Sequence, residues 1–163
     1  MKKITFIINP IAGHKRYKEV ERKIHKYIDN SKFSLKIKYS KKKGDLKTIT
    51  KQAIANGSKI IIGVGGDGTV NEISGELINS NIKMGIIPTG SGNGLALSIG
   101  IPNNIKKAIE KINSQSIKKI DCISVNDLHS INLIGFGFDA LVSKEFSKES
   151  NRGLIKYIYL TFK

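Results

Sequence analysis

The chain has 163 residues, of which 39% are hydrophobic and 25% are charged. This length and balance are typical of an ordinary globular domain and exclude a disordered chain. Lys and Arg outnumber Asp and Glu by 28 to 13, a net charge of +15, which should attract nucleotides, nucleic acids or an anionic membrane surface. The charge alone does not distinguish between these partners. Lysines at solvent-facing helix and turn positions, in a sequence rich in Ile, Lys and Asn, account for part of the positive charge.

Cysteine content and hydropathy limit the cellular compartments that suit this chain. Cys122 is the only cysteine, which excludes an internal disulfide framework and CxxC metal sites and suits a reducing cytoplasm. The apolar stretch Ile4–Ile8 stops at Asn9-Pro10, short of the roughly 7–15 apolar residues of a signal peptide. No run approaches the roughly 18 apolar residues that span a bilayer. A membrane role would therefore be peripheral.

The first 115 residues alternate strand and helix patterns. Runs of β-branched and apolar residues predict strands, at Ile4–Ile8, Phe33–Tyr39, Lys59–Val64 and Lys83–Ile87. Apolar residues at helical spacing predict helices, at Tyr17–Ile28, Leu46–Ala55, Val70–Ile78, Leu95–Ile99 and Ile105–Ile112. This order predicts an α/β fold with a three-layer, doubly wound parallel sheet, in which ligands sit at the carboxyl ends of the strands.

The pattern changes at Ser116. Two strand-like segments meet at Asn126-Asp127, a hairpin signal, and an apolar-periodic tail follows. These segments are Ile117–Val125, Ser130–Phe138, Ala140–Phe146 and Leu154–Phe162. Two strands and a tail do not close a core of their own. We therefore expect residues 1–115 to form a nucleotide-binding domain and residues 116–163 to begin a second, truncated, β-rich domain of a longer protein.

A glycine-rich run, Gly63–Glu72 (GVGGDGTVNE), is the strongest chemical signal. Its glycines let the backbone approach a ligand closely, and the N–H groups that open the next helix face that ligand with the positive end of the helix dipole. Asp67 can hold a magnesium ion or accept a proton from an attacking hydroxyl. We therefore predict a phosphate loop at Gly65–Thr69.

The glycine spacing alone leaves alternatives open. The run lacks the Gly-Lys-Ser/Thr of a Walker A loop, and a lone GxGxxG spacing is weak evidence for dinucleotide binding. A tight strand-to-helix turn needs glycine for its geometry alone. The three histidines, His14, His25 and His129, share no metal-ligand spacing and are expected to be surface residues.

Four motifs, taken in chain order, resemble the diacylglycerol and sphingoid lipid kinases. Gly65–Glu72 matches the hallmark GGDGTxNE, and Asn9–Gly13 looks like the first nucleotide loop of that family. Pro88–Ala96 is similar to its PxGSGN loop, and Ile134–Ala140 to its GFD turn. GGDGT alone is shared with NAD kinases and phosphofructokinases, whereas the combination is far more specific.

The resemblance implies an α/β domain that binds ATP and a β-sandwich domain that supplies the lipid site, with catalysis in the cleft. It implies that Asp67 is the catalytic and magnesium-binding residue and that Glu72 braces the loop. The implied nucleotide-binding residues are Asn9, Pro10, Ala12, Gly13, Ser40, Gly65, Gly66, Asp67, Gly68, Thr69, Asn71, Ser91, Gly92 and Asn93.

The resulting prediction is an ATP- and Mg²⁺-dependent lipid kinase of lipid metabolism and phospholipid biosynthesis. It would phosphorylate diacylglycerol or a sphingoid base. It would act in the cytoplasm, peripherally at an anionic membrane surface. No nucleic-acid partner is expected, and a homodimer is compatible with the sequence. Gly94 stands where diacylglycerol-type members usually carry Asp, so the lipid stays open.

Two other functions remain. One is an NAD kinase-like phosphotransferase, which shares the GGDGT loop; the other is a basic nucleotide- or membrane-binding module without turnover. The general-base glutamate and second-domain magnesium ligands of the family lie further along than residue 163. We therefore expect this chain alone to bind nucleotide weakly and to phosphorylate lipid poorly or not at all.

Overall fold

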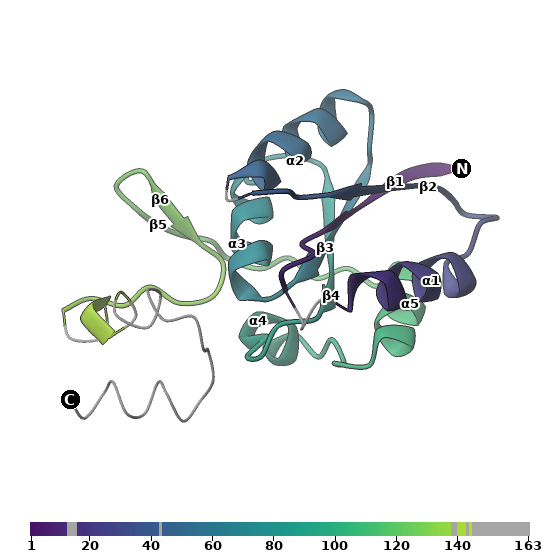
Figure 1. Ribbon diagram of the computed structural model, residues 1–163. Helices are drawn as coiled ribbons and strands as arrows, with labels where there is room; N and C mark the ends of the chain where they lie inside the picture. Colours follow the sequence, from purple (N-terminus) through teal and green to yellow (C-terminus); the bar gives the residue numbers. More distant parts are fainter. Residues whose placement is uncertain (13–15, 43, 138–139, 143, 145–163) are drawn as a thin grey trace. The chain divides into compact units, whose positions relative to one another are not determined.

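The computed structural model describes residues 1–12, 16–42, 44–137, 140–142 and 144. One sheet of four parallel strands forms its centre (Figure 1). In order across the sheet these strands are β2 (Phe33–Tyr39), β1 (Lys2–Ile8), β3 (Ile60–Gly65) and β4 (Lys83–Pro88). All four strands predicted from the sequence are present, and their bounds differ from the prediction by at most two residues.

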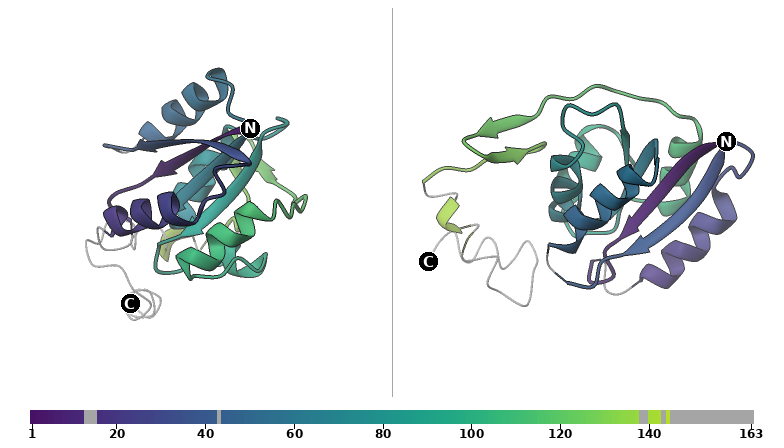
Figure 2. Two further views of the ribbon diagram at one scale, coloured as in Figure 1. Left: turned by 90° about the vertical axis from the view of Figure 1, so that its right-hand side faces the viewer. Right: turned by 90° about the horizontal axis from the view of Figure 1, so that it is seen from above.

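Helices cover both faces of this sheet. The helices are α1 (Tyr17–Tyr27), α2 (Asp45–Ala55), α3 (Asp67–Gly75), α4 (Gly94–Ser98) and α5 (Ile105–Asn113). α1 and α5 pack in one apolar cluster with the sheet, and α2 and α3 pack in another on the opposite face. Figure 2 shows the sheet between these two layers. The predicted three-layer α/β fold is therefore confirmed.

Strand β1 shows how the sequence specifies both layers. Consecutive side chains of a strand point to opposite faces, and here Phe6 joins the cluster beneath α1 and α5 whereas Ile7 joins the one beneath α2 and α3. Both side chains are fully buried. Thr5, also buried, shares a hydrogen bond of 2.8 Å with the Ser58 hydroxyl. A central strand buried on both faces is therefore apolar at nearly every position.

A short antiparallel hairpin follows the sheet, formed by β5 (Ile123–Val125) and β6 (Leu128–Ser130). The predicted turn at Asn126-Asp127 is confirmed, but the predicted strands Ile117–Val125 and Ser130–Phe138 are too long. Residues 117–122 and 131–137 lie outside strands. Their large apolar side chains do not form a buried face that would hold them extended; the exposed ones are Ile117, Ile120, Leu133 and Phe136.

The chain divides into two compact units, residues 1–132 and 133–163. The first unit includes the hairpin, and the predicted domain boundary at residue 115 stays a prediction for the whole protein. The predicted tail segment Leu154–Phe162 and three residues of Ala140–Phe146 (143, 145 and 146) lie outside the described residues. Within the described residues, no helix has the length and hydropathy to cross a bilayer.

Burial of α5 against the sheet gives a stability prediction. Ile109 is fully buried in the cluster beneath α1 and α5, so Ile109→Ala should lower the free energy of unfolding by about 2–5 kcal/mol. Lys107→Ala, an exposed change on the same helix, should alter it by less than about 0.5 kcal/mol. Urea unfolding measures both, and equal effects would contradict the assigned face of α5.

Candidate functional site

The carboxyl ends of the four parallel strands lie at one edge of the sheet, and the predicted site residues follow them. The hydrogen-bond ladder continues one residue past the strand ends, which fixes the starts of the loops relative to one another. These bonds run from Asn9 N to Val64 O (3.0 Å), from Ser40 N to Ile8 O (3.0 Å) and from Thr89 N to Gly65 O (2.9 Å). The edge thus brings together segments that are up to 80 residues apart (89 − 9) in the sequence.

The predicted phosphate loop is shorter than expected because α3 begins at Asp67, not at Val70. Gly66 is the N-cap residue and has an extended backbone (φ −95°, ψ −172°). An acidic residue in the first turn of a helix interacts favourably with the helix dipole, so Asp67 opens the helix instead of belonging to a loop. Because β3 ends at Gly65, the turn itself consists of Gly66 alone.

The first turn of α3 presents backbone donors at this edge. Its first helical hydrogen bond runs from Val70 N to Gly66 O (3.1 Å). The N–H groups of Asp67, Gly68 and Thr69 come before it and have no acceptor within the described residues. Of these residues Gly68 is exposed, and a Cβ added there would meet no atom within 4 Å. Such donors at the positive end of a helix dipole bind anions.

Two glycine-rich segments contact each other through their backbones. A Cβ added at Gly90 would lie 2.5 Å from the Gly66 Cα, and a Cβ added at Gly65 would lie 2.4 Å from the Thr69 Oγ1. Side chains do not fit at such distances without a shift of the backbone or of Thr69. Glycine at position 90 therefore serves the close packing of the loop after β4 against the turn after β3, and glycine at position 65 leaves room for the side chain of Thr69 on α3.

Asn93 holds the loop after β4 in shape. It is buried and left-handed (φ 54°), a conformation that asparagine tolerates better than most residues. Its Oδ1 accepts from Gly90 N (2.9 Å), and its Nδ2 donates to Gly90 O (2.8 Å) and to Asn103 Oδ1 (3.1 Å). The side chain of Asn93 thus closes the loop, while Ser91 and Gly92 are exposed at its tip.

Asn9 connects the first loop to α3. Its Nδ2 donates to the Thr69 hydroxyl (3.0 Å), and its Oδ1 accepts from Ile11 N (3.1 Å). The backbone turns here as well, because Ala12 N donates to Asn9 O (3.1 Å). Pro10 lies inside this turn, whereas the predicted ligand Gly13 lies outside the described residues.

The Asp67 carboxylate, on the first glycine-rich segment, lies against the second one, the loop after β4. Its Oδ1 accepts from Leu95 N at 3.3 Å, and a Cβ added at Gly92 would lie 3.3 Å from its Oδ2. Glycine at that position leaves space beside Oδ2. No group of three or more His, Cys, Asp or Glu side chains within the described residues could hold a metal ion. A single carboxylate fits magnesium bound through substrate phosphates and water.

Two predicted ligands are placed differently from the rest. Ser40 is buried at the end of β2, with its N–H engaged in the ladder. The side chain of Asn71 contacts the hairpin: its Nδ2 donates to His129 O (3.2 Å) and its Oδ1 accepts from Ile131 N (3.2 Å). Nucleotide binding by both residues stays a prediction. Glu72 Oε1 is buried and has no hydrogen-bond partner among the described residues.

The motifs did not indicate a cavity of about 210 Å³ beside the loop after β4, which Arg16, Lys23, Thr89 and Asn103 help to line. Hydrogen bonds from Arg16 and Lys23 lower the pKa of Glu19 to about 2. The available signal in the sequence for this charged lining was the spacing of Arg16, Glu19 and Lys23, which lie three and four positions apart at the start of α1.

The contact between Gly66 and Gly90 yields a second stability prediction. Gly90 does not have a positive φ, so Ala is allowed by the backbone and Gly90→Ala acts through the clash alone. We expect a loss of about 1–3 kcal/mol, measured by thermal or urea unfolding. Gly68→Ala, in the other glycine-rich segment, is the matched control and should cause no loss, because its Cβ enters open space. Equal changes in the free energy of unfolding of the two variants would contradict the close packing of the two segments.

Comparison with known proteins agrees with this geometry. The chain is 28% identical over 150 residues to a diacylglycerol kinase of Staphylococcus carnosus, covering 91% of this chain and 49% of that relative. It is 29% identical over 140 residues to a diacylglycerol kinase of Bacillus subtilis, covering 84% and 46%. The solved structure of a diacylglycerol kinase from Bacillus anthracis matches with a TM-score of 0.66 and 30% identity, over 78% of this chain and 45% of that one.

The chain thus spans less than half of the length of each of these relatives. A family model, the diacylglycerol kinase catalytic domain, matches residues 3–125. That match includes β1 to β4, both glycine-rich segments and the start of the hairpin. This chain belongs to the diacylglycerol kinase catalytic domain family.

Proposed function

We propose that this chain is the nucleotide-binding part of a lipid kinase that transfers the γ-phosphate of ATP to a lipid hydroxyl, such as that of diacylglycerol or a sphingoid base. The proposal rests on the N–H groups of Asp67, Gly68 and Thr69, which have no acceptor within the described residues and open a helix at which Gly68 is exposed. Family membership supports phosphate transfer, and the relatives named diacylglycerol kinase support a lipid acceptor.

The chemistry is an in-line displacement at phosphorus. The lipid hydroxyl oxygen forms a bond to the γ-phosphorus, the bond from that phosphorus to the bridging oxygen breaks, ADP leaves with the electron pair and the hydroxyl proton passes to a base. Protein groups contribute chiefly by positioning and by stabilising charge. The amides of α3 would hold phosphate oxygens in place, and Asp67 would hold magnesium. Magnesium, when bound, neutralises charge that develops on the phosphate oxygens.

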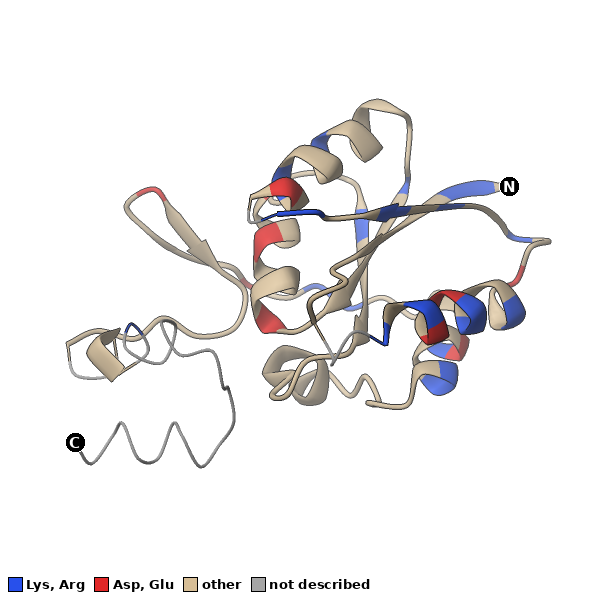
Figure 3. Cartoon of the chain, viewed as in Figure 1, with Lys and Arg blue, Asp and Glu red and all other residues tan. Residues whose placement is uncertain are grey.

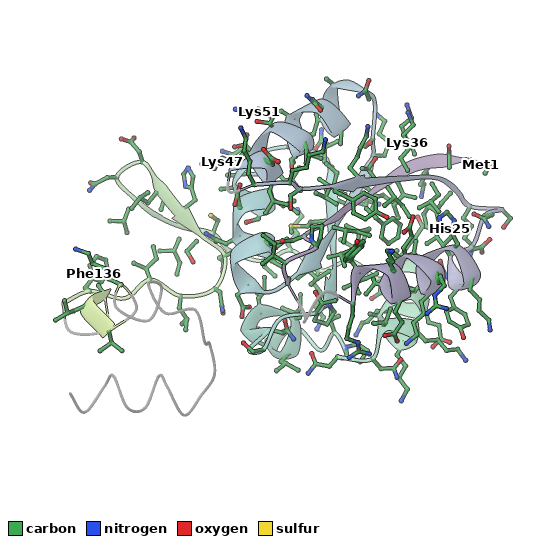
Figure 4. All side chains as sticks on the ribbon, viewed as in Figure 1. Met1, His25, Lys36, Lys47, Lys51 and Phe136 are labelled. Atoms are coloured by element: carbon green, nitrogen blue, oxygen red, sulfur yellow. The ribbon has the colours of Figure 1, made fainter. Side chains whose placement is uncertain are left out.

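The positive charge of the chain supports access to a lipid surface. Lysines lie on α1, α5 and β2 (Figure 3). Lys36, Lys47 and Lys51 are exposed and point away from the sheet (Figure 4). Basic residues near an anionic leaflet each contribute about 1 kcal/mol of attraction. Peripheral binding to an anionic membrane is therefore part of the proposal.

Asp67→Asn tests the metal role while keeping the side chain's shape and its acceptor for Leu95 N. ATP raises the melting temperature of a protein that binds it, and the increment gained on adding Mg²⁺ should be large in the wild type. In Asp67→Asn that Mg²⁺-dependent increment should shrink, corresponding to about tenfold weaker binding or about 1.4 kcal/mol. With EDTA the variant should bind ATP at least as well as the wild type, because one negative charge beside the phosphates is gone.

Asp127→Asn is the matched control, since it removes the same charge from an exposed hairpin turn. An unchanged Mg²⁺ increment in Asp67→Asn would remove Asp67 from the metal site. The acceptor is identified with γ-labelled ATP and the full-length protein, because this chain alone is expected to phosphorylate lipid poorly or not at all. The label should enter a lipid extract when diacylglycerol or sphingosine vesicles are supplied. Label in NADP instead, with NAD supplied, would favour the NAD kinase-like function.

A further inference from the structure

The side chain of Asn71 makes two hydrogen bonds to the hairpin, to residues two apart in the sequence. Its Nδ2 donates to His129 O and its Oδ1 accepts from Ile131 N, both at 3.2 Å. This is the pairing that a residue of a neighbouring strand would offer with its own N–H and C=O. Asn71 lies on α3, one turn after Asp67, so a helix side chain takes the place of a strand.

The hairpin explains why these backbone groups are available. Val125 pairs with Leu128 across a two-residue turn, and residues that flank such a turn exchange hydrogen bonds with each other. The next pair, Ser124 and His129, is then a non-hydrogen-bonded pair. The C=O of His129 therefore points to the outer edge of β6, where backbone groups need a partner other than β5. Asn71 provides that partner.

Apolar packing places the same segment beside α3 and α4. Ile131 packs against a buried cluster that includes Val70 of α3 and Leu95 of α4. Asn132 follows directly, and its Nδ2 would lie 3.1 Å from a Cβ added at Gly94. Residues 129–132 therefore run past the beginnings of the two helices that follow the glycine-rich segments.

We propose that Asn71 is a positioning residue, which docks residues 129–132 onto the phosphate-binding helix. Its amide fixes where residues 129–132 cross α3, beside the proposed phosphate site. This role differs from the nucleotide ligand predicted from the sequence, because both polar atoms of the side chain contact hairpin backbone. The docking itself does not depend on the proposed kinase function; its consequence for phosphate transfer does.

Residue-resolved hydrogen exchange on this chain, without nucleotide, tests the docking. Asn71→Ala should speed exchange of the Ile131 N–H about three- to tenfold, the range expected for the loss of a hydrogen bond. Exchange of the core amide of Ile62 should stay unchanged, because Ala is a better helix former than Asn and α3 is kept. His129→Ala is the matched control: it removes an exposed side chain and keeps the carbonyl that Asn71 contacts, so Ile131 exchange should not change.

Binding of ATP–Mg²⁺ to the same variants separates positioning from nucleotide binding. Affinity should change less than about twofold in Asn71→Ala, against about tenfold in Asp67→Asn. In the lipid phosphorylation assay, carried out with the full-length protein, Asn71→Ala should lower kcat and leave the KM for ATP unchanged. Unaltered Ile131 exchange, or a loss of ATP affinity as large as in Asp67→Asn, would overturn the proposal. If the wild type binds no ATP, the kinase function fails, and the exchange result alone decides the role of Asn71.

Discussion

The backbone contact between Gly66 and Gly90 is the constraint on which the rest of the site depends. Because a Cβ on Gly90 would lie 2.5 Å from the Gly66 Cα, the turn after β3 and the loop after β4 approach each other with no side chain between them. Asn93 closes one segment, and Asp67 links the other to α4 through Leu95 N. The candidate site is therefore built from backbone held in place by short polar side chains.

Much of the fold could be predicted because hydrophobic patterning specifies strands that are buried on both faces. Lys59–Val64 is apolar at nearly every position, and β3 appears there almost as expected. The hairpin strands were less predictable: apolar residues such as Ile117 and Phe136 suggested long strands, yet both side chains are exposed. A local pattern shows that a side chain is apolar, but burial also requires a partner surface, which the pattern does not supply.

The candidate site was predictable in its location and less so in its details. Glycines after a buried strand located the turn between β3 and α3, but the start of α3 at Asp67 was missed because aspartate and glycine are typical of loops as well as of first helical turns. The motif also grouped Asn71 with the nucleotide ligands, although its side chain contacts backbone about 60 residues later. Contacts across such a distance depend on the tertiary fold and leave no local signal in one sequence.

Backbone amide NMR during titration with ATP–Mg²⁺ tests the central claim most directly, since it observes the proposed phosphate donors themselves. The N–H resonances of Asp67, Gly68 and Thr69 should shift most, and the resonance of the Ile131 N–H beside the hairpin should shift little. Saturable binding with those three resonances unmoved would place the triphosphate elsewhere and would contradict a phosphate site at the start of α3.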